Sequence, residues 1–136
     1  MKRKLRRIPQ RDWANGDCGL ACVAMVAGVS YEEALGVFRG LDRPNENGFY
    51  TRYREIEEML TRLGCVTRRR HFRSWKHFDQ HAIVKVNLCK SGTWHWVVFD
   101  AARASPTVHD PKPGKRSLIT KFNGLKGAGC YIAIVE

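Results

Sequence analysis

The order of apolar and polar residues divides the chain into a helical first half and a strand-rich second half. An unbroken apolar run at residues 20–27 predicts a buried helix. Ser30 and Glu33 have the spacing of a capping box, which predicts the start of a second helix. A third helix is expected between Thr51 and Gly64, because its apolar residues recur at helical spacing.

The second half has the alternation and the residue types of β-strands. Its runs of β-branched and aromatic residues are separated by connections rich in Gly, Pro and Ser. A loop is expected at residues 41–48 and a short helical turn at residues 74–80. Because the helices come first and the strands follow, the pattern predicts an α+β domain with N-terminal helices packed on a C-terminal antiparallel sheet. The expected strands cover residues 66–72, 82–88, 93–100, 106–110 and 130–135.

A chain of 136 residues fits one domain that is large enough to bury a core. We expect residues 1–9 to form a basic N-terminal arm and residues 10–136 to form that single domain. No apolar stretch approaches the roughly 20 residues of a membrane span, and no signal segment opens the chain. The five cysteines are odd in number and irregularly spaced, which indicates free thiols in a reducing compartment. A soluble, cytoplasmic protein is expected.

The net charge of +11 is large for this length and would attract anionic partners. Basic residues cluster in the N-terminal arm and again at Arg68, Arg69 and Arg70. The second cluster fits an exposed edge strand, where charge discourages aggregation. No recognised nucleic-acid motif accompanies either cluster. An anionic partner for the arm, either nucleic acid or an acidic protein, therefore stays open.

The strongest candidate for chemistry is the thiol of Cys18, at the start of the predicted buried helix. The turn residues Asn15 and Gly16 lead into this helix, and Asp17 is a good N-cap residue. In the first helical turn, unpaired N–H groups and the positive end of the macrodipole favour a thiolate. The negative charge of Asp17 would oppose the thiolate unless its carboxylate turns back to cap the helix.

A nucleophilic cysteine needs a base, an orienting partner for that base, and donors for an oxyanion. His95 lies in a predicted strand, and Asp110 ends the next strand, so its carboxylate can accept the ring N–H of His95. Gln10 can donate to an oxyanion together with the backbone N–H of Cys18, and Asn15 is the alternative donor. Taken singly, each also has an ordinary structural interpretation, such as a core histidine or a turn aspartate.

Metal binding is a weaker interpretation of the same region. Cys18, Cys22 and His95 lack the second pair of ligands that makes a zinc prediction strong. His77 and His81 have helical spacing but lie in a polar turn, where we expect them at the surface. No metal or other cofactor is predicted.

In combination, these residues resemble the bacteriocin-processing, double-glycine cysteine peptidases, which are papain-like enzymes. The resemblance implies a papain-like fold, with Cys18 as nucleophile, His95 as base, Asp110 as orienting residue and Gln10 as oxyanion donor. A small residue such as Gly before the scissile bond is implied by the family alone. The resemblance covers nearly the whole domain in chain order, through Gln10, Asp17-Cys18-Gly19, Gly92-Thr93-Trp94-His95 and Asp110-Pro111 with Gly114.

The leading hypothesis is a cysteine peptidase that cleaves a peptide or protein substrate through a Cys-His-Asp triad. Two alternatives stay open. The same residues can transfer the acyl group to an acceptor other than water. A basic module on the same scaffold can instead bind nucleic acid or an acidic protein, with Cys18 silent.

Overall fold

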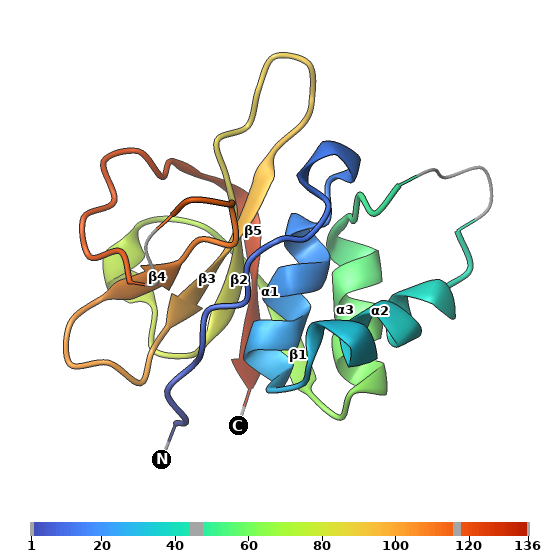
Figure 1. Cartoon of the computed structure of the whole chain (residues 1–136). Coiled ribbons are helices and arrows are strands. Elements are labelled where there is room, and N and C mark those ends of the chain that lie inside the picture. Colours follow the sequence, from blue (N-terminus) through green and yellow to red (C-terminus); the bar gives the residue numbers. More distant parts are fainter. Residues whose placement is uncertain (1, 44–47, 116–117, 136) are drawn as a thin grey trace.

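The computed structural model describes residues 2–43, 48–115 and 118–135. Over these residues the chain runs through three helices and then five strands (Figure 1). Of the loop expected at residues 41–48, positions 44–47 lie outside the described residues. The helices are α1 (Cys18–Ala27), α2 (Tyr31–Arg39) and α3 (Tyr53–Arg62), with 3-10 turns η1 (Trp13–Asn15) and η2 (Trp75–His77). The strands are β1 (Val66–His71), β2 (Ala82–Val86), β3 (His95–Asp100), β4 (Thr107–His109) and β5 (Gly127–Val135).

The strands form one sheet in the order β1-β5-β2-β3-β4, in which every neighbouring pair is antiparallel. The helices lie together beside this sheet (Figure 1). The predicted α+β architecture, with helices packed on an antiparallel sheet, is confirmed. The arginine-rich β1 is an edge strand, as its charge predicted, and it pairs with β5.

Helix α1 is the centre of the core, because it is apolar on every side and its residues 18–26 are buried. It packs against β3, α2 and α3. Trp96 and Val98 of β3 point into the apolar cluster that surrounds α1. Val97 and Phe99 point into a second apolar cluster on the other face of the sheet, which confirms the predicted alternation. Among the described residues no single helix is long and apolar enough to cross a membrane, and α1 and α2 pass that test only as a pair bent by 117°.

The helix ends follow local sequence signals. The side chain of Ser30 caps α2 as predicted, by accepting the N–H of Glu33 at 3.0 Å. Gly28 ends α1 in the left-handed conformation that favours glycine. Helix α3 begins at Tyr53, slightly later than expected, because Arg52 is still extended and is the N-cap residue.

Residues 2–10 lie along the body of the domain, and we call them the N-terminal strap (Figure 1). The side chain of Leu5 is buried in the core. Its N–H donates to the carboxylate of Asp100 at 3.1 Å, and its carbonyl accepts from Arg103 at 3.0 Å. His81, which we expected at the surface, is buried. Its Nε2 donates to the carbonyl of Arg3 at 2.7 Å, because its Nδ1 accepts a backbone N–H. The expected arm is thus packed onto the domain.

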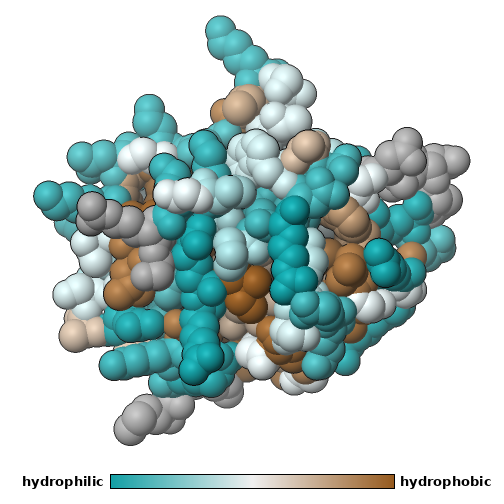
Figure 2. Space-filling view, in the orientation of Figure 1, coloured by the Kyte–Doolittle hydropathy of each residue, from teal (hydrophilic) through white to brown (hydrophobic). Residues whose placement is uncertain are grey.

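The face of the molecule that carries the N-terminal strap, seen in Figure 2, is largely hydrophilic. Figure 2 shows apolar colour there only in separate patches between polar side chains. Some of the strap's charge is used internally, since Arg3 donates to the carbonyl of Val26 at 3.1 Å. Arg11, just after the strap, forms an exposed ion pair with Glu32 at 2.5 Å. Part of the high positive charge therefore has partners within the protein.

Gly19 is required by close packing beneath the first turn of α1. A Cβ at this position would lie 2.0 Å from Thr51 Oγ1 and 3.1 Å from the Trp96 ring. Gly19→Ala is therefore expected to lower the free energy of unfolding by about 1–3 kcal/mol, the usual cost of overpacking a core. Gly36→Ala in α2 is the matched control. It meets nothing within 4 Å and should raise stability by about 0.5–1 kcal/mol. Urea unfolding of both variants tests this, and equal effects would contradict it.

Candidate active site

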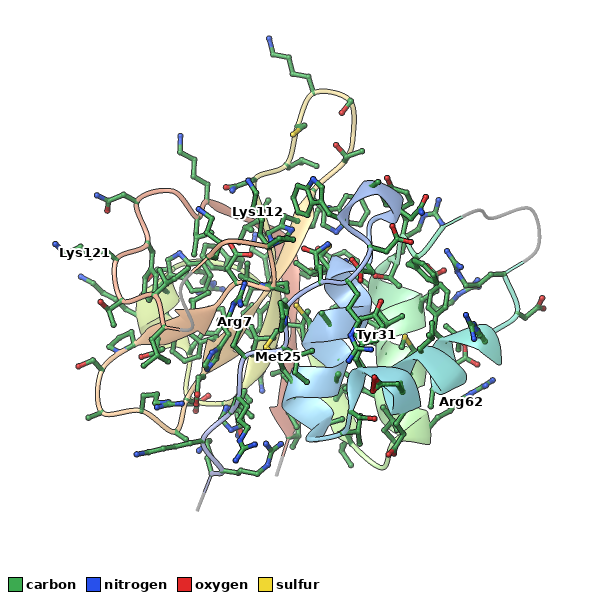
Figure 3. All side chains as sticks on the ribbon, in the orientation of Figure 1. Arg7, Met25, Tyr31, Arg62, Lys112 and Lys121 are labelled. Carbon is green, nitrogen blue, oxygen red and sulfur yellow. The ribbon has the colours of Figure 1, made fainter. Side chains whose placement is uncertain are left out.

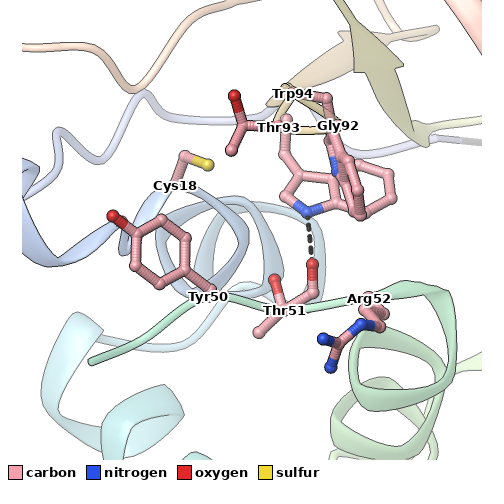
Figure 4. A pocket seen from close by; sticks show the side chains of 9 residues that line it. Cys18, Tyr50, Thr51, Arg52, Gly92, Thr93 and Trp94 are labelled. Atoms are coloured by element: carbon pink, nitrogen blue, oxygen red, sulfur yellow. Dashed lines mark hydrogen bonds between the residues drawn. The ribbon is translucent and has the colours of Figure 1, made fainter. Parts of the chain in front are cut away.

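Cys18 is the first residue of α1, and its side chain lies where two hollows meet. The residue is buried to 9% exposure, so its sulfur is reached through these hollows. One hollow, of about 360 Å³, lies between the segment at 50–52 and the segment at 92–94. Figure 4 shows Cys18 and Tyr50 on one side of it and Thr93 and Trp94 on the other. The second hollow, of about 600 Å³, is also lined by His95, Asp110 and Gln10.

The segment at 50–52 is anchored to strand β3. The indole N–H of Trp96 donates to the carbonyl of Thr51 at 3.1 Å (Figure 4). Because Trp96 follows His95 in β3, the same strand fixes this wall and carries the histidine. One wall of the smaller hollow is therefore fixed by a hydrogen bond to the sheet.

Asp17 occupies the N-cap position of α1, but its side chain does not cap the helix. The carboxylate is fully buried and points away, toward the chain before the helix. It accepts hydrogen bonds from the Tyr31 hydroxyl at 2.7 Å, from Gln10 Nε2 at 2.9 Å and from two backbone N–H groups. Burial raises the pKa of this carboxyl, but the hydrogen bonds outweigh burial and leave the pKa below its ordinary value. The capping role that we considered for Asp17 is wrong.

His95 and Asp110 are brought together by the β3–β4 pairing. His95 is the first residue of β3. Asp110 lies just beyond the end of β4, because the strand is shorter than predicted and ends at His109. The Nε2 of His95 bonds Asp110 Oδ1 at 2.6 Å. Since Nε2 is occupied, Nδ1 is the other ring nitrogen, and Cys18 lines the same hollow close enough to raise the pKa of the ring. The structure thus brings the three side chains to one hollow, where His95 and Asp110 are hydrogen-bonded.

These contacts change the charge of the imidazole. Burial lowers the pKa of His95, but the hydrogen bonds to Asp110 and Cys18 outweigh it and raise this pKa to about 9. Burial likewise raises the pKa of Asp110, while its bond to His95 brings that pKa below the ordinary value. At neutral pH the ring is therefore cationic.

Gln10 lies at the same hollow, but its amide has a partner of its own. Its Nε2 donates to Asp17, and its Oε1 is buried without a hydrogen-bond partner. The carboxylate of Asp17 fixes the orientation of this amide, because only the N–H side can face it. Asn15, the alternative donor, turns its amide to the carboxylate of Asp12 at 2.9 and 3.0 Å. Gln10 is the better placed of the two.

Trp13 and Tyr31 belong to this region and were missed from the sequence. The ring of Trp13 meets His95 edge to face at 6.0 Å, although Trp13 itself is 51% exposed. Tyr31 holds Asp17 from α2. The signal that could have indicated Trp13 is its position as an isolated tryptophan beside a turn. Nothing in the pattern distinguished Tyr31 from an ordinary core residue of an amphipathic helix.

All five cysteines are free thiols. Cys22 lies one turn below Cys18 and is fully buried; burial raises its pKa well above the ordinary value. Cys89 is exposed and lines the larger hollow together with Cys18. Among the described residues, no group of three or more His, Cys, Asp or Glu side chains is arranged to hold a metal ion.

Comparison with known proteins identifies the fold. No protein-family model matches the chain, and no curated protein matches it either. Among solved structures, the chain is similar to a double-glycine motif protease from an AMS/PCAT transporter, crystallised in complex with the leader peptide. The TM-score is 0.64 at 19% sequence identity, and the match covers 96% of this chain and 91% of the other. The papain-like α+β fold implied by the sequence resemblance is confirmed.

Proposed function

We propose that this chain is a cysteine peptidase that cleaves a peptide or protein substrate, after a small residue such as Gly. One observation carries the proposal. Cys18, at the N-terminus of a buried helix, lines one hollow together with His95, whose ring Nε2 bonds Asp110 and whose pKa the thiol raises. The fold supports the proposal, because the similar double-glycine protease was solved with a leader peptide.

The reaction would use these groups in sequence. The Cys18 thiolate attacks the substrate carbonyl carbon, and a C–S bond forms as the carbonyl electrons move to the oxygen. Protonated His95 then gives its proton to the amine as the C–N bond breaks. Water, deprotonated by His95, attacks the thioester and releases the acid. Asp110 holds the ring and stabilises its charged form throughout.

The oxyanion would be held by the backbone N–H of Cys18 and by Gln10. The first N–H groups of a helix have no intrahelical partner, so that of Cys18 is a natural donor. The amide of Gln10 has two N–H donors, and the bond to Asp17 leaves one for the substrate oxygen.

Gln10→Ala is expected to lower kcat by about 10²–10³-fold with little change in KM. Asn15→Ala is the matched control and should leave kcat unchanged. Steady-state kinetics of peptide cleavage distinguish the two amides. A loss of kcat in Asn15→Ala but not in Gln10→Ala would mean that Asn15 is the oxyanion donor.

The function is tested with peptides that share their flanks and differ only in the residue before the scissile bond, as Gly, Ala or Leu. Products are identified by mass spectrometry, with and without an added amine acceptor. Cleavage fastest after Gly is expected. Products that carry the amine would establish acyl transfer by the same residues. If no peptide is cleaved or transferred while iodoacetamide still labels Cys18, the peptidase proposal is wrong.

A further inference from the structure

The two strap arginines with carbonyl partners contact different ends of the domain. Arg3 donates to the carbonyl of Val26, near the C-terminus of α1. Arg7 donates through Nε to the carbonyl of Asp110 at 2.8 Å and through Nη2 to the carbonyl of Lys112 at 2.6 Å. Figure 3 shows Arg7 on the strap, below Lys112. Only the second contact reaches the segment that carries a candidate site residue.

The segment at 110–112 depends on the strap for its position. Asp110 lies beyond the end of β4, so sheet pairing does not fix its backbone. Its carbonyl and that of Lys112 bind Arg7, and the carbonyl of Pro111 accepts the N–H of Gln10 at 2.8 Å. All three successive carbonyls of this segment therefore accept hydrogen bonds from the strap. The Asp110 carboxylate, in turn, bonds His95.

We propose that Arg7 is a positioning residue, whose forked hydrogen bonds to the 110–112 segment hold the Asp110 carboxylate against His95. The guanidinium suits this task because its donors lie in a rigid fork, whereas an ammonium offers a single flexible point of contact. The inference rests on the proposed function, since it assigns the basic strap a part in the same site. It also gives one of the strap's positive charges a role other than binding an anionic partner.

The test uses the full chain and compares Arg7→Ala with Arg3→Ala. Both variants remove one charge and one arginine anchor from the strap, but only the first releases the Asp110 segment. The primary readout is the titration of the His95 ring by NMR, which needs no substrate. We expect the pKa of His95 to fall by about one unit or more in Arg7→Ala, because burial then acts against a weaker Asp110 bond. Arg3→Ala should titrate as the unaltered protein does.

Kinetics provide the second readout. Arg7→Ala should lower kcat about 10- to 100-fold with KM nearly unchanged, the cost of a small misplacement at a catalytic group. Arg7→Lys keeps the charge without the fork and should restore only part of this loss. In an Asp110→Ala background, Arg7→Ala should cost little more, because the group it positions is already absent. Thermal unfolding of each variant shows whether the fold is intact, and Arg7→Lys replaces Arg7→Ala if the latter does not fold.

Three results would overturn the proposal. The first is an unchanged His95 titration in Arg7→Ala, and the second is the same shift in Arg3→Ala. The third is a loss of kcat on Arg7→Ala that is as large in the Asp110→Ala background as in the unaltered protein. That result would mean that Arg7 stabilises the fold in general and does not act through Asp110. If the unaltered protein cleaves nothing but the His95 titration responds to Arg7 alone, the positioning role stands and the peptidase proposal fails.

Discussion

Replacing Cys18 is expected to abolish peptide cleavage without unfolding the protein. Cys18→Ala removes the thiol that lines the larger hollow with His95 and raises the pKa of its ring, and the rate should fall by roughly 10⁶-fold, the scale on which a hydrolase loses rate with its nucleophile. Cys18→Ser keeps the shape and a polar atom but supplies a much weaker nucleophile at neutral pH. Both variants should unfold at nearly the same temperature as the unaltered chain, because one small side chain at the helix N-terminus has changed. Peptide cleavage followed by mass spectrometry, with thermal unfolding alongside, measures both quantities.

Cys89 provides the control for this experiment. It lines the same hollow as Cys18 but is exposed and has no contact with the histidine among the contacts described. Cys89→Ala should therefore retain full activity, and it removes the other thiol in that hollow that a reagent can reach. Activity that survives in Cys18→Ala and disappears in Cys89→Ala would mean that Cys89, in the connection between β2 and β3, is the nucleophile.

The sequence predicted the elements well wherever a local signal decided the structure. The apolar run of α1, the cap at Ser30 and the alternation around Trp96 all depend on neighbouring residues, and each is confirmed. The position of β5 between β1 and β2 could not be predicted in this way. That position depends on pairings between residues far apart in the chain, which leave no local pattern.

The site was predicted by residue type and chain order, while its supports were not. Cys18, His95 and Asp110 were proposed from the sequence; the structure shows a hydrogen bond between His95 and Asp110 and places Cys18 on the same hollow. Asp17 was misjudged because an acidic residue before a helix usually caps it, whereas here a buried tyrosine and three other donors compete for the carboxylate. The strap was misjudged for a similar reason, since a run of basic residues gives no sign that Leu5 is buried within it.

The pH dependence of cleavage should be governed at its upper end by His95. The ring must be protonated to give a proton to the leaving amine, and its pKa is about 9 because the bonds to Asp110 and Cys18 outweigh the opposite effect of burial. Hence kcat/KM should hold up to about pH 9 and fall above it. Alkylation by iodoacetamide needs the thiolate alone, so its rate should not fall in the same range. Profiles of both rates from about pH 5 to about pH 10 measure this difference.

Substitution of Asp110 separates its charge from its hydrogen bond. Asp110→Asn retains an oxygen that can accept the Nε2–H of His95, but it removes the negative charge. The pKa of His95 should then fall, because burial lowers it and one opposing contact is weaker, and the upper limb of kcat/KM should move to lower pH. Asp110→Ala removes the acceptor as well, so that the ring is no longer oriented, and kcat should drop by about 10²–10⁴-fold, the usual contribution of general acid–base catalysis. An upper limb that stays near pH 9 in Asp110→Asn would mean that the carboxylate orients the imidazole without controlling its charge.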